Sequence, residues 1–73
     1  PPGYFAGTLI DQTGLKGYTV GGAQVSTKHA GFVVNVGGAT AQDVLQLISD
    51  VQSKVFAAHG VRLEPEVLVL GEE

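Results

Sequence analysis

The pattern of apolar and polar residues predicts one long helix in the second half of the chain. From Ala41 to His59, apolar residues recur every three or four positions, which is the spacing of one buried helical face; they are Val44, Leu47, Ile48, Val51 and Val55. Thr40 is a suitable N-cap, and Asp43 completes a variant capping box with it. Gly60 stands where a helix end favours a left-handed residue. We therefore predict a helix over Ala41–His59.

Two apolar segments on either side of this helix predict strands. Residues 31–36 are rich in strand formers and end at a Gly-Gly pair, so we expect a strand that is covered on both faces. Residues 67–70 read Val-Leu-Val-Leu and predict a final strand. Because Pro65 has no N–H to donate, it belongs at the start of this strand, at an edge or at a bulge.

The first third of the chain predicts smaller elements. Phe5, Leu9 and Ile10 fit a short helix that is ended by a glycine at position 14. Residues 18–20 and 23–25 fit short strand pieces on either side of a Gly-Gly turn. The expected fold class is α+β, in the order α-β-β-α-β. We expect a small, mainly antiparallel sheet packed by two helices, forming one domain over residues 1–73.

Composition narrows the classes of protein that fit this pattern. The chain has 73 residues and no cysteine, which excludes a disulfide framework and a thiolate metal site. Its net charge of −3 argues against non-specific nucleic-acid binding, and no apolar run approaches the roughly 20 residues of a membrane span. Only 15% of the residues are charged, which indicates that part of the surface is normally covered. Because the chain starts at Pro1 without a methionine, we expect a piece of a longer protein.

The segment Gly14-Leu15-Lys16-Gly17 has two functional interpretations. A GxxG loop clamps the nucleic-acid backbone in KH domains, and Lys16 could instead meet a phosphate beside closely approaching backbone. The alternative is a helix C-cap followed by a turn, with Lys16 in solvent. The chain has no GxGxxG or Walker-type loop, so no motif supports binding of a nucleotide cofactor.

A second polar segment, Ser26-Thr27-Lys28-His29, lies between two predicted strands. A Ser/His pair can begin a nucleophilic site, but a triad also needs an orienting carboxylate, and helix or turn roles already explain the three aspartates. The segment is therefore either a loop that offers Lys28 and His29 to a ligand or an ordinary hairpin turn. The two histidines of the chain have no metal-ligand spacing, which makes a metal site improbable.

Glu64 and Glu66 form the third candidate. Residues two apart in an extended segment point to the same side, so the two carboxylates would lie close together at the start of an apolar strand. Desolvation and mutual repulsion would raise their pKa values, and a protonated glutamate is a possible acid. The alternative is a solvated start of a strand.

Four segments follow one another along the chain in a recognisable order and spacing. They read PGYFAGTLID (residues 2–11), GLKG (14–17), GGAQVSTKHA (21–30) and GVRLEPEV (60–67), and Gly71 closes the series. This succession resembles the C-terminal domain of the UDP-N-acetylenolpyruvoylglucosamine reductase (MurB) family. The resemblance covers essentially all 73 residues.

The resemblance implies an FAD-dependent reductase of bacterial cell-wall precursor synthesis. In that family, NADPH reduces the flavin, and the flavin passes hydride to UDP-N-acetylglucosamine enolpyruvate, giving UDP-N-acetylmuramate. Two N-terminal domains bind FAD, and the C-terminal domain closes over the substrate. The chain is thus expected to be the substrate-binding domain of a cytoplasmic enzyme, to contact the FAD-binding domains, and to be inactive alone.

The resemblance also implies roles for three residues. The second glutamate of the family's Leu-Glu-Pro-Glu-Val segment falls on Glu66, whose protonated carboxyl would stabilise charge developing on the substrate carboxylate. The family's lysine near the UDP portion falls on Lys16, and His29 falls on the substrate side, where some relatives carry glutamine. The family's serine acid and its partner arginine would lie upstream of this chain, so Ser26 is not that serine.

Two other functions stay open on the sequence. The chain can be a non-catalytic module that binds a UDP-sugar with the same fold, or a small KH-like RNA-binding domain built on residues 14–17. The acidic net charge weighs against the second.

Overall fold

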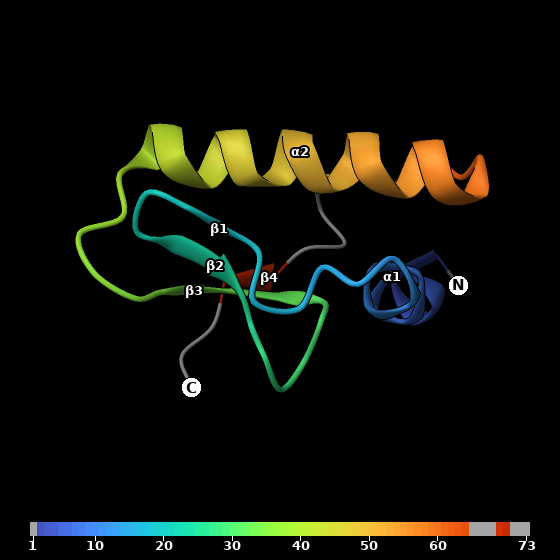
Figure 1. Cartoon of the computed structure of the whole chain (residues 1–73), viewed down its shortest axis with the longest axis horizontal. Coiled ribbons are helices and arrows are strands. Elements are labelled where there is room, and N and C mark those ends of the chain that lie inside the picture. Colours follow the sequence, from blue (N-terminus) through green and yellow to red (C-terminus); the bar gives the residue numbers. More distant parts are fainter. Residues whose placement is uncertain (1, 65–68, 71–73) are drawn as a thin grey trace.

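The computed structural model describes residues 2–64, 69 and 70 (Figure 1). In chain order the elements are α1 (Pro2–Gln12), β1 (Thr19–Val20), β2 (Ala23–Val25), β3 (Phe32–Asn35), α2 (Ala41–His59) and β4 (Val69–Leu70). The predicted α+β class is confirmed. The order holds one strand more than the predicted α-β-β-α-β, because the two pieces beside the Gly-Gly turn are separate strands that pair with each other.

The four strands form one sheet in the order β1-β2-β3-β4. β1, β2 and β3 pair in antiparallel fashion, with Val25 opposite Val33 between β2 and β3. β4 returns after α2 and pairs in parallel with β3, with Phe32 opposite Val69. A parallel neighbour requires such a crossover, and α2 provides it. The mainly antiparallel sheet is therefore confirmed; of the predicted last strand, residues 67 and 68 lie outside the described residues.

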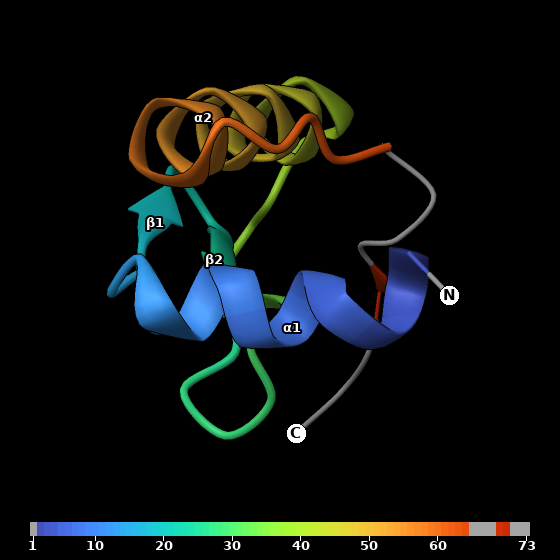
Figure 2. The same ribbon diagram turned by 90° about the vertical axis from the view of Figure 1, so that its right-hand side faces the viewer.

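The two helices pack against different parts of the sheet. α2 covers one face, and α1 lies at one end of the sheet (Figure 1). The helices run crosswise, since the view along α2 shows α1 from the side (Figure 2). The core lies between the sheet and the helices; its buried members are Ile10, Leu15, Ala23, Val25, Ala30, Val33, Leu47, Val51, Val55 and Leu63. Val34 points to the other face of β3 and is also buried, which confirms that this strand is covered on both faces at its centre.

Both ends of α2 have the predicted caps. The Thr40 hydroxyl accepts a hydrogen bond from the Asp43 N–H (3.0 Å), and the Asp43 carboxylate accepts one from the Thr40 N–H (3.1 Å). Gly60 is left-handed (φ 69°), and its N–H donates to the Phe56 carbonyl. The Asp43 carboxylate also accepts a hydrogen bond from the Gly22 N–H (3.3 Å). The N-terminus of α2 therefore holds the β1–β2 turn in place.

A second polar link joins α2 to β1 through Asp50. The Tyr18 hydroxyl donates to one carboxylate oxygen of Asp50 (2.7 Å), and the Gln46 amide donates to the other (2.8 Å). The Lys54 ammonium lies 5.3 Å from the centroid of the Tyr18 ring. The hydrogen bonds from Tyr18 and Gln46 lower the pKa of Asp50. Backbone N–H groups lower the pKa of Asp43 in the same way.

We expect acid to destabilise the chain through these two aspartates. Their pKa values in the folded chain lie below the ordinary value of 3.8, so the unfolded chain takes up protons first as the pH falls. Their contribution is therefore complete above about pH 4 and is lost as the pH falls through the folded pKa values. Urea unfolding at pH 7, 4 and 3 should show that acid lowers the free energy of unfolding less for Asp50→Asn than for the parent chain. Equal decreases in the two chains would contradict the stabilising role of the Asp50 carboxylate.

Candidate functional site

The Gly14–Gly17 segment forms the end of α1 and the turn into β1. Gly14 and Gly17 both have positive φ angles (77° and 85°), which favour glycine. Leu15 between them is only 5% exposed and belongs to the core, whereas Lys16 is exposed. The Gly17 N–H donates to the Val25 carbonyl, which ties the segment to β2. The segment therefore has the helix end and turn of the non-functional interpretation, and this turn holds Lys16 on the surface.

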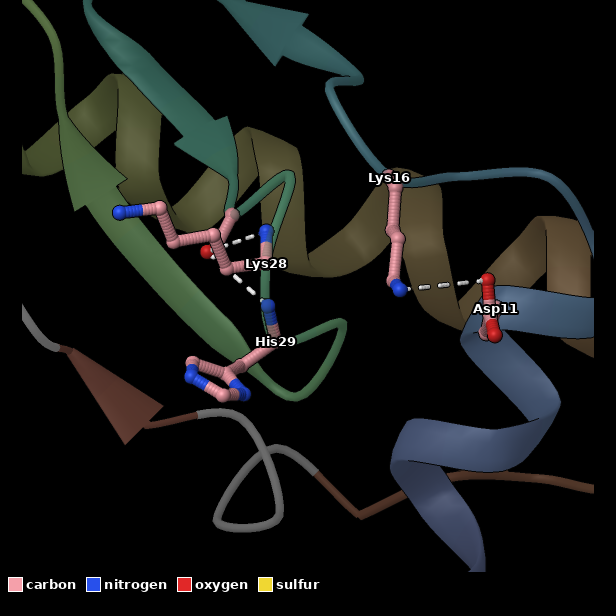
Figure 3. A network of polar contacts seen from close by, with 5 residues as sticks. Asp11, Lys16, Lys28 and His29 are labelled. Carbon is pink, nitrogen blue, oxygen red and sulfur yellow. Dashed lines mark hydrogen bonds and ion pairs between the residues drawn. The ribbon is translucent and has the colours of Figure 1, made fainter. Parts of the chain in front are cut away.

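The Ser26–His29 segment is the turn between β2 and β3. Ser26 is 1% exposed, and its hydroxyl oxygen accepts hydrogen bonds from the backbone N–H groups of Lys28 and His29, each at 3.1 Å (Figure 3). A serine that organises its own turn in this way favours the turn interpretation over a nucleophile. Lys28 and His29 are exposed, so the turn presents both side chains to solvent.

The fold brings these two segments side by side. A Cβ at Gly17 would lie 3.6 Å from the Thr27 methyl group. The side chains nevertheless point in different directions, as Figure 3 shows. Lys16 points toward Asp11 at the end of α1, with 3.7 Å between the ammonium and the carboxylate, and His29 points away from Lys16. Lys16 and His29 thus lie on adjacent loops without forming one cluster.

The turn that carries His29 also adjoins the last strand. The His29 ring packs against Phe32, with 5.6 Å between the ring centroids and a tilt of 48°. Phe32 in turn pairs with Val69 of β4. Glu66, the predicted catalytic residue, lies outside the described residues. The β4 pairing nevertheless shows that the chain returns beside the His29 turn three residues after Glu66.

A shallow cleft of about 350 Å³ lies on α2, separate from the loops of Lys16 and His29. It is lined by Ser49, Gln52, Ser53, Phe56, Arg62, Leu63 and Glu64. Glu64 is exposed at this cleft, which agrees with the solvated interpretation for this glutamate. Sequence reasoning missed the cleft. The residue that could have revealed the cleft in the sequence is Phe56, a large apolar residue outside the buried face of α2. Its side chain is 49% exposed in the structure.

The described residues offer neither a cluster of metal ligands nor an open N-terminus on α2. Among residues 2–64, 69 and 70, no three histidine or acidic side chains lie close enough to hold a metal ion. The N-terminus of α2, where a phosphate would bind, already holds the Asp43 carboxylate. Within the same residues, neither helix is long and apolar enough to cross a membrane.

These features define a small α+β domain whose polar loops, carrying Lys16, Lys28 and His29, meet at one end of the sheet. The chain belongs to the family of the UDP-N-acetylenolpyruvoylglucosamine reductase C-terminal domain (MurB_C), whose sequence profile matches residues 1–70. The predicted family is thereby confirmed.

Individual relatives agree with this assignment. The chain is 60% identical over 73 residues to the UDP-N-acetylenolpyruvoylglucosamine reductase of Pediococcus pentosaceus, and 64% identical over 72 residues to that of Agathobacter rectalis. These matches cover 100% and 99% of this chain, but 24% and 23% of the relatives. The crystal structure of the reductase (MurB) from Thermus caldophilus matches with a TM-score of 0.67 and 55% identity, over 73% of this chain and 20% of that one. The chain therefore spans about a quarter of the length of the curated relatives it matches.

Proposed function

We propose that this chain is the substrate-binding domain of an FAD-dependent reductase that converts UDP-N-acetylglucosamine enolpyruvate to UDP-N-acetylmuramate with NADPH, in cell-wall precursor synthesis. The observation that carries the proposal is the match of residues 1–70 to the C-terminal domain of that reductase family. The fold supports it, because the Lys16 and His29 loops are adjacent and β4 returns beside the His29 turn.

Lys16 and His29 supply the substrate contacts in this proposal. The diphosphate of a UDP-sugar is a dianion, and a lysine ammonium binds phosphate as a point charge. The Asp11–Lys16 pair is exposed on both sides (58% and 38%), so it is weak and can be exchanged for a phosphate at little cost. His29 is exposed and can donate a hydrogen bond to the substrate from an imidazole nitrogen.

Glu66 supplies the catalytic group in this proposal. Hydride addition to a double bond conjugated with a carboxylate moves negative charge onto that carboxylate. A protonated glutamate donating to those oxygens stabilises the charge where it develops. FAD and NADPH supply the hydride when bound; because the family resemblance implies that the N-terminal domains bind FAD, we expect both on the rest of the longer protein. The serine acid and its partner arginine are expected there as well.

The intact protein that contains this domain provides the test. Adding NADPH should bleach its flavin absorbance, and adding UDP-N-acetylglucosamine enolpyruvate should restore it, whereas the isolated chain should be inactive. A parent protein that holds no flavin would overturn the reductase proposal. If it then bound UDP-N-acetylglucosamine in calorimetry, it would be a non-catalytic UDP-sugar-binding module instead.

Lys16→Ala should raise KM for the enolpyruvyl substrate about tenfold and change kcat much less. The reason is that the diphosphate is remote from the reacting carbon, so its contact stabilises ground state and transition state alike. Steady-state kinetics of the intact protein measure the split. Lys28→Ala is the matched control, because Lys28 is an exposed lysine on the adjacent turn that points away from Lys16. Equal effects of the two changes would indicate general loss of positive charge rather than a contact by Lys16.

A further inference from the structure

We propose that Phe32 is a positioning residue for His29, because its ring holds the His29 imidazole in one orientation on the β2–β3 turn. This inference rests on the proposed reductase function, in which His29 donates a hydrogen bond to the substrate. Phe32 is not among the residues that the family resemblance singles out. Both residues lie within the described part of the chain, so the contact between them is observed directly.

The backbone of His29 is held on both sides within its turn. Its N–H donates to the Ser26 hydroxyl oxygen (3.1 Å), and its carbonyl accepts a hydrogen bond from the Phe32 N–H (2.9 Å). The Ser26 N–H donates to the Phe32 carbonyl (2.9 Å), which closes the turn. These bonds fix where the His29 side chain leaves the backbone, but they do not fix the direction of its ring.

The contact with Phe32 restrains the direction of the imidazole ring. His29 is exposed, and an exposed side chain without such a contact exchanges rotamers within about nanoseconds. The centroids of the His29 and Phe32 rings lie 5.6 Å apart, and the two planes are tilted by 48°. This separation is within the range of about 4.5–7 Å in which aromatic rings attract each other. The ring contact therefore favours one orientation of His29.

Phe32 is itself held firmly enough to act in this way. It is the first residue of β3, and its backbone pairs with Val69 of β4. The next residue, Val33, is 2% exposed and packs in the core, which anchors the strand directly beside Phe32. The Phe32 side chain is nevertheless 40% exposed. The sheet thus presents an aromatic ring at the surface beside His29, and groups supported by strands are placed more precisely than groups on loops alone.

Positioning of this kind acts on substrate binding. A side chain that already has its bound orientation loses less conformational freedom when the substrate binds, and this changes affinity by roughly twofold to tenfold for one side chain. A hydrogen bond that is made equally to the bound substrate and to the transition state lowers KM and leaves kcat unchanged. Loss of the Phe32 ring should therefore raise KM for the enolpyruvyl substrate.

The test uses Phe32→Leu in the intact reductase. Leucine keeps an apolar side chain and the backbone pairing of β3 but has no ring. We expect KM for the enolpyruvyl substrate to rise about fivefold, with kcat within about twofold of the unsubstituted protein. Phe32→Tyr retains the ring and should keep the original KM. Phe56→Leu is the matched control, because it makes the same change at another exposed phenylalanine, on α2, and it should leave KM and kcat as they are.

A double-mutant cycle with His29→Ala shows whether Phe32 acts through His29. If it does, adding Phe32→Leu to His29→Ala should raise KM no further. An equal rise of KM in both backgrounds would overturn the inference, because Phe32 would then act on the substrate or on the sheet without His29. A large loss of kcat with an unchanged KM would overturn it as well.

The histidine ring-proton NMR signals of the intact protein report the contact without substrate. A phenylalanine ring shifts the resonances of nearby protons, so Phe32→Leu should move the His29 signals and leave those of His59, at the end of α2, in place. His29→Ala assigns the His29 signals by their disappearance. His29 signals that stay in place in Phe32→Leu would overturn the inference.

Flavin reoxidation in the unsubstituted protein distinguishes this inference from the proposed function. If the enolpyruvyl substrate reoxidises the flavin but Phe32→Leu leaves KM unchanged, only the positioning role fails. If the substrate does not reoxidise the flavin of the unsubstituted protein, the proposed function fails and the positioning role falls with it.

Discussion

Replacing Glu66 by glutamine in the intact reductase should slow flavin reoxidation by the enolpyruvyl substrate at least about 100-fold, while reduction by NADPH keeps its rate. Glutamine preserves the size of the side chain, but its amide is a far weaker acid than a carboxyl. It therefore donates a weaker hydrogen bond to the charge that develops on the substrate carboxylate. Removing one such donor typically costs about 10²–10³ in rate. Rapid mixing, with flavin absorbance as the signal, follows each half-reaction separately.

Glu64→Gln is the matched control for this experiment. Glu64 lies two residues earlier in the same segment, and it is exposed at the cleft on α2. Its loss should leave both half-reactions within about twofold, as surface substitutions normally do. If Glu66→Gln also left both half-reactions at the rates of the unsubstituted protein, Glu66 would have a structural role only.

Gly22→Ala should destabilise the chain by about 3 kcal/mol, because the added methyl group has no space. Gly22 is buried, and a Cβ there would overlap the Gly37 carbonyl oxygen and the Ala39 amide nitrogen. These are backbone atoms that cannot rotate away. The Gly22 carbonyl also accepts the Val36 N–H, so a shift of this turn would break a hydrogen bond as well. Urea unfolding of the chain, followed by circular dichroism, measures the loss.

Gly7→Ala, the same chemical change at another position, should stabilise the chain instead of destabilising it. Gly7 lies within α1, and a Cβ there would be 3.7 Å from the Gly31 nitrogen, which is an ordinary contact distance. Alanine is favoured over glycine inside a helix, so the free energy of unfolding should rise by about 0.5–1 kcal/mol. A loss of less than about 1 kcal/mol for Gly22→Ala, with the expected gain for Gly7→Ala, would show that the β1–β2 turn is less tightly packed than described.

The candidate site was only partly predictable from the residues themselves. Lys16, His29 and Glu66 received roles through the family resemblance, whereas residue chemistry left a helix end, a hairpin turn and a solvated strand start as alternatives. The structure decides the role of Ser26, since its hydroxyl accepts two N–H groups of its own turn. It also shows that Lys16 and His29 occupy adjacent loops.

The hydrogen bond from the Gln52 side-chain amide to the Leu63 carbonyl had no signal in the sequence. A glutamine on the partly exposed side of a helix normally meets water, and its partner here is a carbonyl eleven residues later. The contact forms because the chain turns back after the left-handed Gly60, so that Leu63 lines the same cleft as Gln52 of α2. Hydrogen bonds of this kind depend on the route of a loop, and no spacing rule encodes that route.

The sequence by itself determined the features that depend only on neighbouring residues, above all the limits of α2. The 3–4-residue apolar repeat, the Thr40–Asp43 capping box and Gly60 set the limits of α2, because their partners lie within a few residues. The tertiary structure decided what depends on distant partners. The pairing of Phe32 with Val69 joins residues that α2 separates, and Asp43 reaches Gly22 across 21 positions. Such contacts form only when the sheet and α2 pack on one core, so the full fold, and not the local sequence, brings the two polar loops and the last strand together.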